Sequence, residues 1–123
     1  MPIIDYSFES GIFFARETGD LSEADATEWA ERLESCAASS PTPVAAVVDA
    51  LEAGYAFDEA REIFARASYT TNLLCVAVAS HPFNETTARV IGLLGKLGHT
   101  HVFATVEEAY AYARRCLQST QSR

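Results

Sequence analysis

The hydrophobic pattern of this chain switches several times between strand-like alternation and helical spacing. Apolar and polar residues alternate over Ile4–Phe8, and a second apolar run begins at Ile12 after the turn pair Ser10-Gly11. Alternation on both sides of a short turn predicts an N-terminal β-hairpin. Gly19-Asp20 is expected to break the second strand of this hairpin.

Three continuous apolar runs follow the hairpin, and each is typical of a buried strand. They span Val44–Asp49, Leu73–Ala79 and Val102–Ala104, and Asp49 is expected to end the first of them. Leu73–Ala79 is apolar at every position, so we expect it in the centre of the sheet with both faces covered.

Apolar residues at helical spacing separate these strands and predict four helices. One is capped by Ser22, one carries Phe57, Ala60, Phe64 and Ala67, one runs from Asn84 to about Leu97, and one is opened by the capping box of Thr105 and Glu108. The inner face of the first helix is expected to consist of Ala26, Trp29, Ala30, Leu33 and Ala37. The predicted fold class is α/β, with a single mixed, mostly parallel sheet, an N-terminal β-hairpin and four helices.

Length and composition limit the possible functions. A chain of 123 residues suits a single domain, predicted here at 1–117, and the polar residues 118–123 are expected to form a flexible tail. The net charge of −8 and the lack of a basic run argue against binding to nucleic acid or to an anionic membrane. No apolar run is long enough for membrane insertion, and the N-terminus does not resemble a signal peptide.

The three cysteines predict the compartment. Cys36, Cys75 and Cys116 are odd in number, widely spaced and without a CxxC motif, which is typical of free thiols in a reducing environment. We therefore expect a cytoplasmic protein.

Three segments carry a resemblance to a known family. Val44–Gly54 is an apolar run that leads through Asp49-Ala50 into a helix, Gly19-Asp20-Leu21 precedes another helix, and Thr100–Ala109 combines a closing strand with a helix start. In these segments the chain resembles the STAS domain, in its divergent SpoIIAA-like (STAS/SEC14-like) branch. The bacterial anti-sigma-factor antagonists of this family carry an Asp-Ser pair whose serine is phosphorylated, and here the pair is Asp49-Ala50. The resemblance implies a non-catalytic regulatory or protein-interaction module without that switch.

The candidate binding residues follow the ends of two predicted strands, because ligands of open α/β sheets bind at the carboxyl edge. The candidate binding loop consists of Asp49, Ala50, Leu51, Glu52, Gly54 and Tyr55, together with Ser80 and His81 from the next strand. Asp49 also occupies the position of a receiver-domain phosphoacceptor, but the chain lacks the matching acidic pair and lysine. Ser80 and His81 are adjacent, so their side chains diverge and do not form a nucleophile–base pair. We expect no catalytic residue and no enzyme activity.

Metal binding has one candidate pair. His99 and His101 would project to the same side of an extended segment and supply half of a metal site, but no third ligand is evident in the sequence. We expect neither a metal nor another cofactor.

The predicted helix from Asn84 to about Leu97 has an apolar arc wider than one sheet face requires. Either the helix is wedged deeply between the sheet and its neighbours, or Val90, Leu93 and Leu97 form an interface with a protein partner or a second copy, giving a homodimer. A third possibility is a carrier of a small apolar or lipid-like ligand. Its cleft would be lined by Tyr55, Phe57, Phe64 and Phe83.

Overall fold

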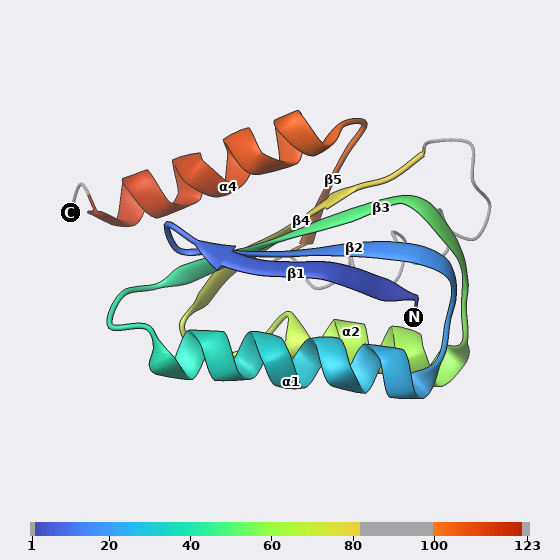
Figure 1. The fold of residues 1–123 in the computed structure, drawn as a ribbon. Helices are drawn as coiled ribbons and strands as arrows, with labels where there is room; N and C mark the ends of the chain where they lie inside the picture. The colour runs from blue at the N-terminus through green and yellow to red at the C-terminus, as the bar shows by residue number, and fades with distance from the viewer. Residues whose placement is uncertain (1, 82–99, 122–123) are drawn as a thin grey trace.

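The computed structural model describes residues 2–81 and 100–121. One five-stranded sheet has the order β1-β2-β3-β4-β5, with β1 antiparallel to β2 and the other neighbours parallel (Figure 1). The elements are β1 (Ile3–Glu9), β2 (Ile12–Leu21), α1 (Glu23–Ser39), β3 (Val44–Ala56), α2 (Asp58–Ala67), β4 (Leu73–Ala79), β5 (Thr100–Phe103) and α4 (Val106–Gln121).

The helices lie in two layers, with α1 and α2 below the sheet and α4 above it in the view of Figure 1. Because β2, β3 and β4 follow one another across the sheet, right-handed crossovers place α1 and α2 on the same face. The predicted α/β fold with a mostly parallel sheet and an N-terminal hairpin is therefore confirmed. The described residues contain three helices, and the fourth prediction, from Asn84 to about Leu97, lies outside them.

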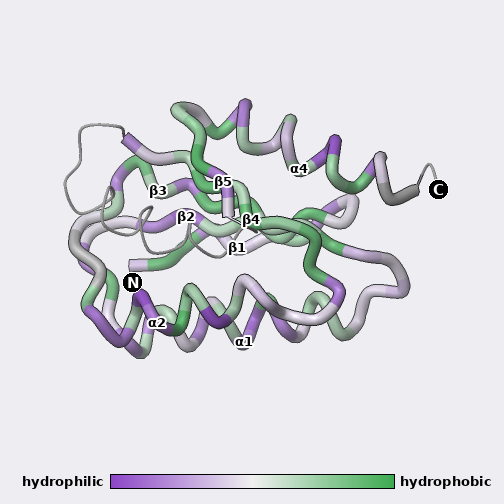
Figure 2. The backbone as a smooth tube through the Cα atoms, turned by 180° about the vertical axis from the view of Figure 1, so that it is seen from behind, coloured by the Kyte–Doolittle hydropathy of each residue, from purple (hydrophilic) through white to green (hydrophobic). Residues whose placement is uncertain are grey.

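The face under α1 and α2 is packed by large side chains. Ser22 caps α1 in a capping box with Asp25, as predicted, and the expected inner face of α1 is buried. Its Trp29 ring lies 6.3 Å from that of Phe13 and 5.3 Å from that of Phe64, measured between ring centroids. The tube in Figure 2 alternates between hydrophilic and hydrophobic segments along both helices, as expected for helices that bury one side.

On the opposite face the buried side chains are mainly small, and the aromatic rings of Phe14, Phe103, Tyr110 and Tyr112 are only partly buried against them. Ala109, Ala113 and Leu117 of α4 are buried against Ala45 and Ala77 of the sheet. The predicted start of this helix is also present, because the Glu108 N–H donates to the Thr105 hydroxyl at 3.1 Å. β4 lies between β3 and β5 and is buried almost throughout, as expected for a strand covered on both faces, although β3 takes the central place among the described strands. The helix continues beyond Leu117 to Gln121, into the segment expected to be a tail.

The first strand does not keep the simple alternation predicted for it. The β1–β2 register shifts between Ile4 and Ser7, and Asp5 has a φ of 56°. This β-bulge turns Ile3 toward the core and leaves Phe8 41% exposed, so of the alternating residues Ile4, Tyr6 and Phe8 only Tyr6 packs against the core of this face.

The second strand continues past the predicted break. Gly19 has a φ of 65°, which glycine adopts without strain, and it pairs with Ala53 of β3. Parallel pairing with β3 therefore carries β2 through Gly19-Asp20 to Leu21. Among the described residues, no helix is long and apolar enough to cross a membrane.

Candidate interaction surface

The segment predicted as a binding loop is the second half of β3. This strand does not end at Asp49 but runs to Ala56, because the extended β2 supplies pairing partners as far as Leu21. Two register shifts interrupt the pairing, between Arg16 and Thr18 and between Gly19 and Leu21. The prediction of a loop here is therefore wrong, and the polar residues that suggested it lie in an irregular strand.

Asp49 is held by polar contacts on both of its carboxylate oxygens. Oδ2 accepts a hydrogen bond from Nε of Arg16 at 3.1 Å, and Oδ1 accepts one from the Leu51 N–H at 3.2 Å. Arg16 also forms an ion pair with Asp5, in which Nη1 lies 3.1 Å from Oδ2. The Arg16 guanidinium thus links β1, β2 and β3, and the buried Asp49 charge is compensated by a cation. This arrangement agrees with a structural role for Asp49, which bonds the backbone of its own segment.

Ala50 faces the core. It is 5% exposed and belongs to the apolar cluster under α1 and α2. A side chain at this position points away from solvent, so a hydroxyl placed here would not be accessible to an enzyme.

The residues that follow Ala50 offer the exposed apolar side chains of this end of the sheet. Leu51 is 39% exposed and Phe57 44% exposed, and the exposed carboxylates of Glu52, Asp58 and Glu59 accompany them. Asp58 forms an ion pair with Arg61. We call residues 51–59 the β3–α2 segment. It combines apolar contact area with negative charge at the start of α2, where carboxylates also complement the helix dipole.

Gly54 brings the ends of β2 and β3 into close contact. A Cβ atom at this position would overlap the carboxylate of Asp20 and lie 3.1 Å from the carbonyl carbon of Gly19. Glycine is therefore required for the close approach of the two strands. Tyr55 lies in the same stretch of β3.

Ser80 and His81 lie at the carboxyl end of the neighbouring strand. Asp49 pairs with Ala79, so Ser80 follows directly beside it at the same edge of the sheet. Ser80 is 2% exposed, its N–H donates to the Phe103 carbonyl at 2.9 Å, and its hydroxyl has no partner within the described part of the chain. His81 is exposed. At this edge of the sheet, the His81 side chain is therefore accessible to solvent and the Ser80 side chain is not.

Several predicted site residues lie outside the described residues, namely Val90, Leu93, Leu97, His99 and Phe83. His101 packs against Tyr112 with 4.7 Å between ring centroids. In residues 2–81 and 100–121, no three metal-ligating side chains come together.

The aromatic residues proposed to line an apolar cleft do not share one environment. Phe64 is 6% exposed and packs edge-on against Trp29, so it belongs to the core. The prediction that Phe64 lines a cleft is therefore wrong. Phe57 is exposed at the start of α2.

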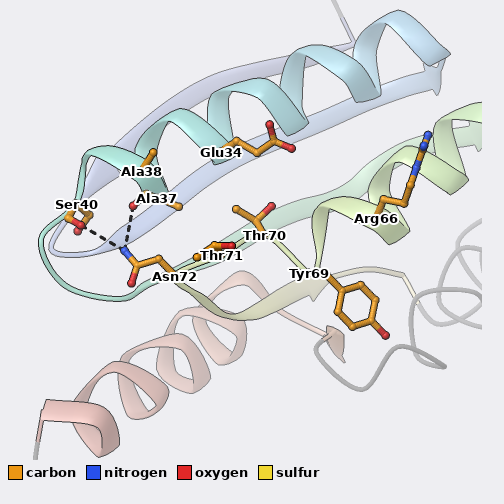
Figure 3. A pocket seen from close by; sticks show the side chains of 9 residues that line it. All are labelled: Glu34, Ala37, Ala38, Ser40, Arg66, Tyr69, Thr70, Thr71 and Asn72. Atoms are coloured by element: carbon orange, nitrogen blue, oxygen red, sulfur yellow. Dashed lines mark hydrogen bonds between the residues drawn. The ribbon is translucent and has the colours of Figure 1, made fainter.

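A surface hollow of about 750 Å³ lies at the other end of the sheet, between the ends of α1 and α2 (Figure 3). Its lining includes Glu34, Arg66, Tyr69 and Thr70. The amide of Asn72 donates to the carbonyls of Ala37 at 3.0 Å and Ser40 at 3.3 Å. A mixed polar and charged lining of this kind does not suit an apolar ligand.

Glu17 is a buried carboxyl group that the sequence analysis did not single out. It is 7% exposed, and burial raises its pKa from 4.5 to about 8, with a further increase from the Asp49 carboxylate. The nearby Tyr6 hydroxyl is also buried, and burial raises its pKa to about 12. Glu17 is thus largely protonated at neutral pH.

The structure also shows which signals could have identified the missed residues. Arg16 and Glu17 are two adjacent charged residues inside an apolar strand, a pattern that often places at least one charge in a buried or paired position. That Arg16 would pair with both Asp5 and Asp49 depends on the β1 bulge and the strand register, and the sequence pattern does not contain this information.

Comparisons with known proteins were made on sequence and on structure. No family model and no curated protein matches this chain. The structure is similar to that of an anti-sigma factor antagonist from Mycobacterium paratuberculosis, with a TM-score of 0.64, 19% identity and coverage of 91% of this chain and 94% of that chain. It is also similar to an uncharacterised protein with a SpoIIAA-like fold from Shewanella loihica, with a TM-score of 0.64, 17% identity and coverage of 90% and 93%. The resemblance to a STAS domain is thus confirmed at the level of the fold.

Proposed function

We propose that this chain, which has the SpoIIAA-like fold over nearly its whole length, is a non-catalytic regulatory module that binds another protein through its β3–α2 segment. The fold is shared with an anti-sigma factor antagonist, a class of protein whose name describes an effect on another protein. Because one fold hosts many functions, the exposed side chains of the site must carry the argument.

The observation that carries the proposal is the exposure of Leu51 and Phe57 among carboxylates. Large apolar residues that remain exposed beside charged ones are typical of protein-binding sites, where aromatic side chains supply much of the binding energy. Glu52 and Glu59 add negative charge to a chain whose net charge is −8. A partner with a basic, partly apolar surface fits this segment best.

The module is proposed to work without phosphorylation at position 50. Ala50 has no hydroxyl, and its methyl group lies in the core under α1 and α2. Incubation with a serine kinase of the anti-sigma type is expected to leave the mass of residues 49–55 unchanged. A phosphate mapped inside that range would contradict this part of the proposal.

Affinity capture with matched variants tests the binding surface. Leu51→Ser combined with Phe57→Ser should lower the amount of partner recovered from the source cells at least about tenfold, the effect of losing about 1.4 kcal/mol of binding free energy. Tyr69→Ser is the control, because Tyr69 is 58% exposed at the opposite end of the sheet. Equal recovery with the double variant and the wild type would reject this surface.

The remaining expectations rest on the sequence and stay proposals. They are a homodimer through Val90, Leu93 and Leu97 and a location in the cytoplasm. The size of the particle in solution, measured by light scattering for the wild type and for Leu93→Lys combined with Leu97→Glu, addresses the dimer separately from partner capture.

A further inference from the structure

Two cysteine side chains meet between the sheet and α4. Cys75 belongs to β4 and is 2% exposed, and Cys116 belongs to α4 and is partly exposed. Both belong to the apolar cluster of the α4 face, where Cys116 packs against the buried residues, and the Cys116 thiol is near enough to raise the pKa of the Cys75 thiol. Cys36 lies on α1, which packs on the opposite face of the sheet, and contacts the other apolar cluster.

We propose that Cys75 and Cys116 form a redox-active pair, which a peroxide converts into a disulfide that ties α4 to β4. A disulfide needs two sulfur atoms that can close to about 2 Å without displacement of the backbone. Cys75 on a buried strand and Cys116 on the helix packed over it belong to one cluster, whereas Cys36 packs against the opposite face, so Cys75 and Cys116 come nearest to this requirement among the three cysteines.

The two thiols differ in a way that fixes the order of events. Cys116 is partly exposed, so a peroxide reaches its sulfur first. Burial raises the pKa of the Cys75 thiol well above its usual range, and the neighbouring Cys116 raises it further, so Cys75 stays protonated in the core. Cys116 is therefore the thiol that is oxidised, and Cys75 the thiol that resolves it.

The reaction balances with one peroxide molecule. The Cys116 sulfur attacks a peroxide oxygen, the O–O bond breaks, and the products are a Cys116 sulfenic acid and one water. The Cys75 sulfur then attacks the Cys116 sulfur. The S–O bond breaks as the S–S bond forms, and the Cys75 proton leaves with the hydroxyl group as a second water. Two thiols lose two electrons, and hydrogen peroxide gains them.

Tyr112 is placed to assist the first step. It lies one helical turn before Cys116 in the same cluster, and burial, with a further increase from Cys116, raises its pKa to about 12. Its hydroxyl thus keeps its proton and can donate to the peroxide oxygen that leaves when the Cys116 sulfur is oxidised.

The test is treatment of the purified full chain with hydrogen peroxide, followed by alkylation of the remaining thiols. The intact mass should show one alkylated cysteine, and unreduced peptides should link Cys75 to Cys116 and carry the label on Cys36. Cys36→Ser is the matched control and should give the same linked peptide with no label. A reductant should restore three free thiols, and the oxidised protein should have the higher melting temperature because the link constrains the unfolded chain.

The variants separate the two roles. Cys116→Ser should abolish the link, and Cys75→Ala should leave a Cys116 sulfenic acid that a dimedone probe captures. Peptide mapping of the wild type decides the question even if the buried Cys75→Ala change unfolds the domain. A link that includes Cys36, a disulfide between two chains, or oxidation of Cys116 to the sulfinic acid with Cys75 still free would overturn the proposal.

Discussion

The two faces of the sheet are each covered by helices, but the buried side chains of the two layers differ in size. Under α1 and α2, the buried ring of Trp29 packs against those of Phe13 and Phe64. Under α4, the buried positions are mostly small residues such as Ala109 and Ala113, and the aromatic rings of that face are only partly buried. The aromatic face thus depends on large buried side chains and the alanine face on small ones, so opposite substitutions should damage them.

Polar groups are also distributed unequally between the faces. Glu17 is the register partner of Ile3 in the aromatic core, and the Tyr6 hydroxyl and Trp29 Nε1 of that core have no hydrogen-bond partner among the described residues. The α4 face instead contains the neighbouring thiols of Cys75 and Cys116. The stability of the first face should therefore depend on pH through Glu17, and the second face should respond to oxidants through its two thiols.

The largest expected effect is the loss of the central ring of the aromatic face. Trp29→Ala removes a side chain that is 2% exposed and should lower the free energy of unfolding by about 3–5 kcal/mol. Urea denaturation monitored by circular dichroism measures this loss. Tyr69→Ala, an exposed aromatic residue, is the control and should cost less than about 0.5 kcal/mol. Similar losses for both variants would contradict the proposed role of Trp29 in the core.

The next effect is the pH dependence of stability that the buried carboxyl group of Glu17 causes. The folded pKa of Glu17 is raised above the unfolded value, so the native state binds the extra proton between the two, and stability falls as pH rises from 4.5 to about 8. The loss should be on the order of 4 kcal/mol, because the folded and unfolded pKa values differ by about 3.5 units, each unit corresponds to about 1.4 kcal/mol, and this pH window covers most of the difference. Glu17→Gln should remove this slope and be the more stable protein at about pH 9.

Urea denaturation at about pH 5 and about pH 9 measures the difference between the two proteins. Glu52→Gln is a matched control, because Glu52 is exposed. If Glu17→Gln keeps the pH dependence of the wild type, the carboxyl group is not the source of that dependence.

The smallest of the three effects lies on the alanine face. Ala113→Leu inserts a larger side chain at a position of α4 that is fully buried against the sheet. The overpacking should lower the free energy of unfolding by about 1–3 kcal/mol. The melting temperature reports the loss, with Arg114→Leu on the exposed side of the same helix as the control. A stabilised Ala113→Leu protein would show that the α4 face contains unfilled space.

The sequence pattern predicted those parts of the fold that depend on local periodicity. The inner face of α1, the strand Leu73–Ala79 and the caps of Ser22 and Thr105 follow from residues close to one another in the chain. The end of β3 could not be predicted in this way, because its pairing beyond Asp49 depends on the unexpected length of β2. The same holds for the pairing of Arg16 with Asp5 and Asp49, which depends on a bulge in β1.

The structure changes the form of the candidate site that the sequence pattern suggested. The sequence singled out Asp49 to Tyr55, and the structure places these residues in a strand with Ala50 inward and Leu51 outward. A period of two does not reveal a bulge, so the alternation alone does not give the direction of each side chain.

Photo-crosslinking in the source cells tests the proposed binding surface most directly. Benzoylphenylalanine replaces Phe57 in one variant and Tyr69 or Phe8 in the others, three exposed aromatic positions on different parts of the molecule. The account predicts a covalent adduct to another protein from position 57 and none from positions 8 and 69. Adducts from position 8 or 69 with none from 57 would contradict binding through the β3–α2 segment.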